Sequence, residues 1–205
     1  MSQASDPRTE LILASGSKTR LDMLRAAGLS VAAEKPGVDE DMVKQSLRAD
    51  GAGVGDVAEA LAEMKALRVS QRYPGAHVVA ADQMLECGEV WFDKPPDRDH
   101  LLGQLLALRG KTHELISSVV VAIDGGRIWH HTDRARLTMR DFSDQFAADY
   151  VDAVGDAGLA SVGGYQVEGR GIQLFSAVSG SHHTILGMPL LPLLDFLRQR
   201  EVVAA

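Results

Sequence analysis

The chain has 205 residues, of which 45% are hydrophobic, and its 28 acidic and 21 basic residues give a net charge of −7. This size and composition are typical of one globular domain with a sizeable core, and the acidic balance argues against a general nucleic-acid binder, because affinity for the phosphate backbone rests on clustered lysine and arginine. The single cysteine, Cys87, excludes an intramolecular disulfide and a cysteine-rich zinc site.

The start of the chain, Met1–Glu10, is polar and lacks the basic and apolar regions of a secretory signal. No apolar run reaches the length of about 18 residues that a membrane span requires. We therefore expect a cytoplasmic protein with a single domain over residues 1–205, of which residues 1–9 form a disordered tail.

The first third of the chain predicts one buried strand and two helices. The apolar run Leu11–Ala14 ends at Ser15-Gly16-Ser17, and a helix with Ser17 as its N-cap and Gly28 as its stop is expected to follow. Pro36-Gly37 then breaks the chain before an acidic cluster at residues 39–41. Asp56 is expected to cap a second helix that reaches about residue 70.

The middle of the chain predicts mostly strands. The apolar run over residues 77–81 predicts a strand that ends on Asp82. A β-ribbon over residues 84–92 and a helix over residues 97–108 follow. Residues 115–123 and 127–139 then form a predicted hairpin around Asp124-Gly125-Gly126.

The last third predicts a helix over residues 143–154, a strand over residues 171–178, and a C-terminal helix that Pro189 opens and that ends near Arg200. Helices and strands thus alternate along the whole chain. The expected fold class is α/β, with a sheet that contains some antiparallel pairs.

Two loops that follow strands carry groups suited to ligand binding. Asp82 stands directly after an apolar strand, where α/β sheets bind their ligands, although an aspartate that only starts a turn would give the same pattern. Ser15-Gly16-Ser17 opens a helix, and its backbone amides together with the helix dipole favour an anion there. A plain N-cap with a glycine turn is the alternative for this loop.

Charged residues near these loops extend the same pattern. Arg20 lies in the first turn of a helix, where the dipole disfavours a cation unless an anion is bound. Lys65 lies at the edge of an apolar stripe, and Lys94 precedes two prolines that keep it extended. Glu40 is suited to join Asp82 in holding a divalent cation such as Mg²⁺. For each of these residues, a solvated surface charge remains the alternative.

These segments, taken together and in this order, resemble the Maf family over nearly the whole chain. The resemblance is carried by Leu11–Ser17 with Arg20, Val38-Asp39-Glu40, Leu61–Ala66, Ala81-Asp82-Gln83, Lys94-Pro95, Leu108–His113, Gly163-Gly164-Tyr165 and Leu186–Leu190. It implies an elongated, ITPase-like α/β fold with a mixed sheet, flanking helices and two lobes around a central cleft. It also implies hydrolysis of nucleoside triphosphates to monophosphate and pyrophosphate.

The resemblance implies a role for each matching residue. Asp82 matches the family's proton acceptor and, together with Glu40, its position for Mg²⁺ or Mn²⁺. The phosphate-handling positions of the family are matched by Ser15, Ser17, Arg20, Lys65 and Lys94. The implied partner is a small nucleotide rather than a nucleic acid or a membrane, and because the family is often dimeric a homodimer is open.

Three further positions match those that distinguish the subgroups of the family. Gln83 stands where the dTTP- and UTP-preferring group has threonine, and Glu168 stands where that group has glutamine. Both residues resemble the subgroup that prefers 7-methyl-GTP. Thr19 departs from the arginine or bulky residue usual at the first specificity position, so a dTTP- or UTP-preferring pyrophosphatase stays open. A non-catalytic, nucleotide-binding regulator of septum formation is the alternative from another functional class.

Overall fold

The computed structural model describes residues 11–204, so the tail predicted over residues 1–9 lies outside the described residues. The strands are β1 (Leu11–Ala14), β2 (Ala32–Glu34), β3 (His77–Cys87), β4 (Val90–Phe92), β5 (Thr112–Ile123), β6 (Gly126–Met139) and β7 (Phe175–Ser179). They form one mixed sheet in the order β2-β1-β3-β5-β6-β7, and β4 pairs with the far end of β3. The predicted α/β class with a mixed sheet is confirmed.

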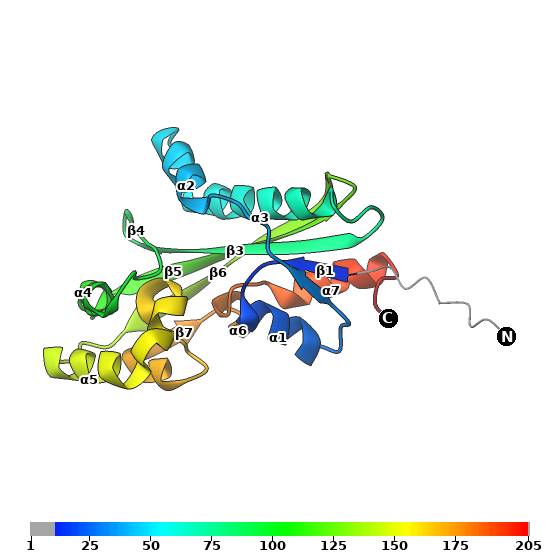
Figure 1. Ribbon diagram of the computed structural model, residues 1–205. Coiled ribbons are helices and arrows are strands. Elements are labelled where there is room, and N and C mark those ends of the chain that lie inside the picture. The colour runs from blue at the N-terminus through cyan, green and yellow to red at the C-terminus, as the bar shows by residue number, and fades with distance from the viewer. Residues whose placement is uncertain (1–10, 205) are drawn as a thin grey trace.

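Helices flank this sheet on both faces (Figure 1). The α-helices are α1 (Lys18–Ala26), α2 (Glu40–Ala49), α3 (Val54–Ser70), α4 (Arg98–Leu108), α5 (Asp144–Val154), α6 (His182–Ile185) and α7 (Leu190–Gln199). Three short 3₁₀ helices, η1 (Gly155–Ala160), η2 (Val162–Gly164) and η3 (Arg170–Leu174), connect α5 to β7. Within the described residues, no helix is long and apolar enough to span a membrane.

The period of two along the central strands divides the core between the two faces. Leu13 and Val79 pack with α1 and α7 on one face, whereas Ile12 and Val78 pack with α3 on the other. β1 and β3 are parallel and buried on both faces, which explains why their sequences are continuously apolar rather than alternating.

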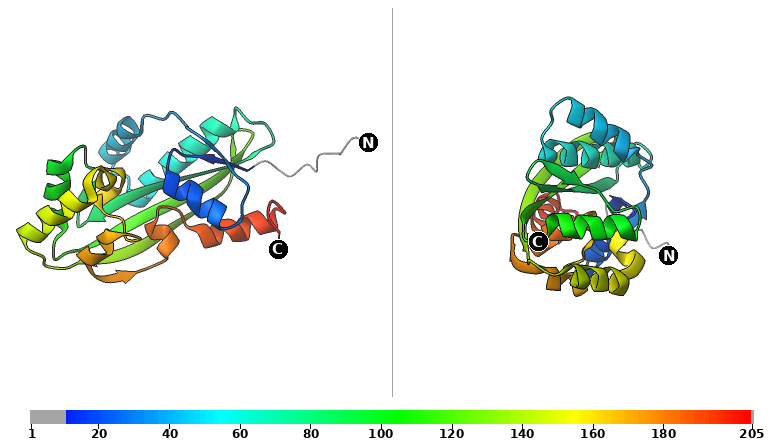
Figure 2. Two further views of the ribbon diagram at one scale, coloured as in Figure 1. Left: turned by 60° about the horizontal axis from the view of Figure 1, so that its bottom comes forward. Right: turned by 90° about the vertical axis from the view of Figure 1, so that its left-hand side faces the viewer.

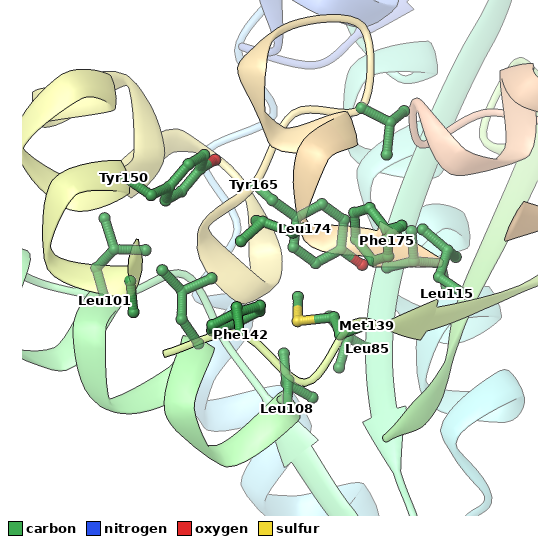
Figure 3. Packing of buried hydrophobic residues seen from close by; sticks show 14 of the residues in the cluster. Leu85, Leu101, Leu108, Leu115, Met139, Phe142, Tyr150, Tyr165, Leu174 and Phe175 are labelled. Carbon is green, nitrogen blue, oxygen red and sulfur yellow. The ribbon is translucent and has the colours of Figure 1, made fainter. Parts of the chain in front are cut away.

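A separate apolar cluster forms the other end of the molecule. It is built around Leu101 and Leu108 of α4, Tyr150 of α5, Tyr165 from the segment before β7, and Phe175 at the start of β7 (Figure 3). The left view in Figure 2 shows this end, with α4 and α5, at the opposite end of the long sheet from α7. The molecule therefore has two packing centres, the core around β1 and β3 and the cluster between α4, α5 and β7. The predicted two-lobed, elongated shape follows from their separation.

Local signals placed several helix starts correctly. Ser17 caps α1 by accepting a hydrogen bond from the backbone N–H of Arg20, and Gly28 follows that helix with φ +85°. Ser143 and Asp97 cap α5 and α4 in the same way. The Asp124-Gly125 turn joins β5 and β6 as predicted.

Other predictions of the elements were wrong. The strand that was expected to end on Asp82 continues to Cys87, so Asp82 lies in its middle, opposite Ser118 of β5. Gly53 rather than Asp56 is the N-cap of α3, and Asp56 accepts from the Gly53 N–H three residues back, because an aspartate at the third helical position also marks a helix start.

The segment predicted as a strand over residues 171–178 is 3₁₀ helix η3 as far as Leu174, and β7 begins only at Phe175. Gly171 explains the tight turn, because a Cβ there would lie 2.5 Å from the backbone oxygen of Gln166. The pattern predicted none of β2, α2 and α6, which are short or carry few buried residues.

Candidate active site

A cleft of about 1180 Å³ lies between the two packing centres. It opens where β1 ends and β3 continues, because β1 and β3 pair in parallel only as far as Leu13 and Val79. Ser15 and Asp82 therefore lie just beyond the carboxyl end of the parallel part of the sheet, where α/β folds bind ligands. All ten residues that the sequence predicted as site residues line this cleft: Ser15, Ser17, Thr19, Arg20, Glu40, Lys65, Asp82, Gln83, Lys94 and Glu168.

The innermost part of the cleft is a group of three ionisable side chains. Lys65 Nζ lies 2.6 Å from Asp82 Oδ1 and 2.7 Å from Glu40 Oε1, so one ammonium joins carboxylates from β3 and α2. The side chains of Lys65 and Asp82 are only 5% and 6% exposed, whereas that of Glu40 is 43% exposed. Burial raises the pKa of Glu40, but the charges of Lys65, Lys44 and Lys94 outweigh burial and leave this pKa below its ordinary value.

Asp82 Oδ2 is buried and has no hydrogen-bond partner among residues 11–204. A buried carboxylate oxygen without a partner is costly, so this atom is suited to accept a proton, a water molecule or a cation when a ligand is bound. The pairing with Lys65 leaves one oxygen of Asp82 held and the other available for chemistry.

Arg20 and Ser15 form the wall on the α1 side. Arg20 Nε donates to the carbonyl oxygen of Gly187 at 2.8 Å, and Ser15 Oγ accepts from the backbone N–H of Ser17 at 3.1 Å. Burial lowers the pKa of Arg20 from its ordinary value, and the carboxylates of Asp82 and Glu40 offset this only in part. Gly187 has φ +98°, and a Cβ there would come within 3.2 Å of the Arg20 guanidinium, so a glycine is needed where the chain holds this arginine.

Gln83 is held almost entirely by the protein. Its Nε2 lies 3.0 Å from Ser117 Oγ and 3.0 Å from each of the carbonyl oxygens of Thr184 and Ile185. The amide nitrogen therefore ties β3 to β5 and to α6, and Oε1 is the atom of this side chain that stays available to a ligand.

The opposite end of the cleft is formed by turns rather than by long elements. Residues 157, 159–162 and 165–168 line it, and exposed Glu168 lies in the turn between η2 and η3. Gly163 and Gly164 have φ +72° and +74°, and a Cβ on Gly164 would lie 1.8 Å from Leu101 Cδ1, so this backbone packs directly on α4.

Tyr165 connects these turns to the apolar cluster behind them. Its hydroxyl lies 2.6 Å from Nε2 of His113, a buried histidine of β5, and its ring packs edge-on against Phe175 at 4.8 Å (Figure 3). Burial lowers the pKa of His113 to about 4 and raises that of Tyr165 well above its usual range. Both groups are therefore neutral at physiological pH, and the residues that pack behind the turns at this end of the cleft carry no charge there.

Comparisons with known proteins agree with this geometry. The sequence profile described as "Maf-like protein" matches residues 10–200. The chain belongs to the Maf family. The motifs along the chain predicted this membership, and the prediction is confirmed.

Curated relatives within the Maf family cover almost the whole chain. The chain is 55% identical to the nucleoside triphosphate pyrophosphatase of Paramagnetospirillum magneticum, over 92% of this chain and 97% of the relative. It is 50% identical to the protein of the same name from Granulibacter bethesdensis, over 95% and 98%. It is 45% identical to the 7-methyl-GTP pyrophosphatase of Brucella abortus, also over 95% and 98%.

Two carboxylates of the cleft are candidate ligands for the divalent cation that membership of the Maf family implies. Among the described residues, no group of three or more histidine, cysteine, aspartate or glutamate side chains could hold a metal ion. Glu40 Oε1 and Asp82 Oδ1 nevertheless contact the same atom, Lys65 Nζ, at 2.7 Å and 2.6 Å, so the two carboxylates lie close together. Hard cations such as Mg²⁺ take one or two carboxylates plus substrate phosphates, so this pair fits such an ion once a triphosphate is present.

Among the cleft residues that were not predicted as site residues, Lys44 and Tyr165 bear most directly on the chemistry of the cleft. Lys44 lies one turn after Glu40 on α2, and Tyr165 supports the turns next to Glu168. The sequence signal for Lys44 was its spacing of four residues from Glu40, but this signal has meaning only if the segment is helical. Tyr165 could have been found from Gly163-Gly164-Tyr165, which carried part of the family resemblance.

Proposed function

We propose that this chain is a nucleoside triphosphate pyrophosphatase, which hydrolyses the bond between the α and β phosphates and prefers 7-methyl-GTP. Relatives that are 45–55% identical over nearly the full chain bear the names nucleoside triphosphate pyrophosphatase and 7-methyl-GTP pyrophosphatase. The observation that carries the proposal is the Lys65 ammonium joining Asp82 and Glu40 inside the cleft, beside Ser15 and Arg20.

Asp82 is the proposed general base. Lys65 holds Oδ1, and the unpartnered Oδ2 is the oxygen that takes a proton from the attacking water. Lys65 was predicted to bind phosphate, but its Nζ is shared by two carboxylates, and we propose that it positions Asp82 and Glu40 for the reaction.

The remaining cations and the loop after β1 bind the triphosphate in this proposal. The guanidinium of Arg20, oriented by Gly187, and the exposed ammonium of Lys94 offset the charge that develops on the departing pyrophosphate. The loop that contains Ser15 and Ser17 places backbone amides at the start of α1, where the helix dipole favours an anion. Phosphoryl transfer needs mainly such positioning and electrostatic stabilisation.

Glu40 and Asp82 are the proposed holders of Mg²⁺ or Mn²⁺. When bound, the metal polarises the phosphates and reduces their negative charge, while the protein supplies the base and the cations around it.

The preference for 7-methyl-GTP is proposed from Glu168 at the other end of the cleft. A carboxylate can accept hydrogen bonds from the N1–H and the exocyclic amine of guanine, and it favours the positive charge that methylation at N7 adds. Glu168 is exposed in the turn that lines the cleft, so its carboxylate is accessible to a base that enters there. Thr19 and Gln83 are the other proposed specificity positions.

The proposal is tested by measuring pyrophosphate release with Mg²⁺ and with Mn²⁺ from 7-methyl-GTP, GTP, dTTP, UTP and CTP. We expect turnover that is fastest with 7-methyl-GTP and that falls by about 10²–10⁴-fold in Asp82→Asn, because the variant lacks the base. Asp149→Asn is the matched control, because Asp149 is an exposed aspartate of α5 outside the cleft and its bond to Gln145 survives as an amide contact.

Each outcome of this panel has a definite meaning. Near-normal turnover by folded Asp82→Asn would remove Asp82 from the role of base. Turnover confined to pyrimidine nucleotides would keep the hydrolytic activity and overturn the proposed preference. Failure of the folded wild-type protein to release pyrophosphate from any nucleotide would overturn the proposed function.

A further inference from the structure

Lys44 is a partly buried cation of the cleft to which the chemistry proposed above gives no task. It lies four residues after Glu40 on α2, so both side chains leave the helix on the same face, toward the cleft. Its side chain is only 18% exposed although α2 has no fully buried residue. A long cationic side chain on a surface helix is normally solvated, so its direction into the cleft needs a reason.

The ionic partner of Lys44 comes from a different part of the chain. Lys44 Nζ lies 2.5 Å from Asp93 Oδ1, and Asp93 immediately precedes Lys94 in the segment after β4. Burial lowers the pKa of Lys44, but the bond to Asp93 and the charges of Asp82 and Glu40 outweigh it and leave this pKa above its ordinary value. Lys44 is therefore a cation within electrostatic reach of the same two carboxylates that Lys65 joins.

The two lysines differ in how easily they can change partners. Lys65 is held by two carboxylates, and removing it would leave the buried Asp82 unpaired. The partner of Lys44 is 61% exposed, and an ion pair with an exposed carboxylate contributes little, so a more highly charged anion can replace it. Asp93 loses little by the exchange, because water can solvate its carboxylate.

We propose that Lys44 is a further triphosphate-binding residue, which exchanges the Asp93 carboxylate for the phosphates of the bound nucleotide. This inference rests on the proposed pyrophosphatase function. Lys44 and Lys94 both act on the charge of Glu40, so the exchange places two lysine ammonium groups beside this carboxylate where the phosphates and their metal bind. Asp93 acts as a stand-in for the phosphate when the cleft holds no nucleotide.

The test compares Lys44→Met with Asp93→Asn, because the two substitutions break the same ion pair from opposite sides. If Lys44 binds phosphate, Lys44→Met raises the KM for the nucleoside triphosphate about tenfold or more, which corresponds to one lost charge-assisted contact. Asp93→Asn is expected to lower KM, because it removes the anion that competes for Lys44. kcat is expected to change less than KM in both variants, as for a contact made in the ground and transition states alike.

Binding of inorganic pyrophosphate, measured by calorimetry with the full-length protein, gives a second readout that does not depend on turnover. We expect weaker binding by Lys44→Met and unchanged or tighter binding by Asp93→Asn. Lys111→Met, at an exposed lysine outside the cleft, controls for the loss of one positive charge from the protein.

Equal increases in KM for Lys44→Met and Asp93→Asn would overturn the inference, because they would mean that the pair serves only to hold α2 against the segment after β4. Unchanged pyrophosphate binding by Lys44→Met would overturn it as well. A wild-type protein that turns over no nucleotide would overturn the proposed function instead, so the two failures are distinguishable.

Discussion

The two ends of the cleft are built from different kinds of residues. At the end proposed to bind the phosphates, called the phosphate end below, charged groups on the long elements α3 and β3 are held by ion pairs, of which Lys65 with Asp82 is the most buried. At the end proposed to bind the nucleotide base, called the base end below, glycine turns pack on an aromatic and apolar cluster (Figure 3). The buried polar groups beside this cluster, His113 and Tyr165, are neutral. We infer that the first end depends on charge and the second on shape, so substitutions at the two ends should fail in different ways.

The largest expected effect comes from removing the central charge of the phosphate end. Lys65→Met leaves the Asp82 carboxylate, 6% exposed, without its ionic partner, and breaking a buried pair from one side costs about 3–5 kcal/mol. Urea denaturation would measure this loss. Lys18→Met, which breaks the exposed pair with Asp22, is the control and should change stability by less than about 1 kcal/mol. Wild-type stability in Lys65→Met would show that this end does not depend on its charges.

The corresponding substitution at the base end changes shape without changing charge. Gly164→Ala places a Cβ 1.8 Å from Leu101 Cδ1 at φ +74°, and the combined strain and overpacking should cost about 2–4 kcal/mol. Gly103→Ala is the matched control on α4, because no atom lies within 4 Å of the added Cβ and alanine is the better helix former. Urea midpoints should therefore move in opposite directions, and equal midpoints for the two variants would contradict the shape argument.

The neutral support of the base end predicts a pH dependence. His113 has a pKa of about 4 in the folded protein because it is buried, whereas an unfolded histidine titrates near 6.5. Between these values the unfolded chain binds more protons, so the contribution of His113 to stability is fully present above about pH 6.5 and is lost as the pH falls, by about 1.4 kcal/mol per pH unit. His113→Gln lacks this titration.

The free energy of unfolding of the wild type should therefore fall by about 2 kcal/mol relative to that of His113→Gln when the pH is lowered from 7.5 to 5. Thermal or urea unfolding at both pH values measures it. Tyr165→Phe removes the hydroxyl that contacts His113 but keeps the histidine buried, and it should retain the pH dependence of the wild type. A difference between wild type and His113→Gln that does not change with pH would show that His113 is not neutral for the reason given.

The smallest expected effect lies at the exposed surface of the base end. Glu168→Gln should reduce the preference for 7-methyl-GTP over UTP, measured as the ratio of the two kcat/KM values, by about tenfold, which is about 1.4 kcal/mol. Stability should stay unchanged, because Glu168 is exposed. Glu63→Gln, on α3 outside the cleft, is the matched control. An unchanged ratio would remove Glu168 from the specificity site.

Most of the site could be predicted from the sequence because its residues follow strands or stand at helix starts, where local signals are strong. Ser17 was identified as an N-cap, and the structure places Asp82 in the cleft although its strand continues beyond it. The role of Lys65 could not be predicted, since its two partners lie 25 residues before it and 17 after it, and only packing brings them together.

The sequence by itself determined the α/β class, most of the longer helices and strands, the caps at Ser17, Asp97 and Ser143, and the family to which the chain belongs. These features depend on hydrophobic periodicity and on side-chain hydrogen bonds within a few residues, so a short stretch of sequence is enough to determine them.

The tertiary structure alone decided where α2 docks. Val43 and Leu47 pack against the cluster that contains Leu61 of α3, and the helix is also held by the bonds of Glu40 to Lys65 and of Lys44 to Asp93. The two ion pairs join residues far apart in sequence, so no local pattern could have indicated them.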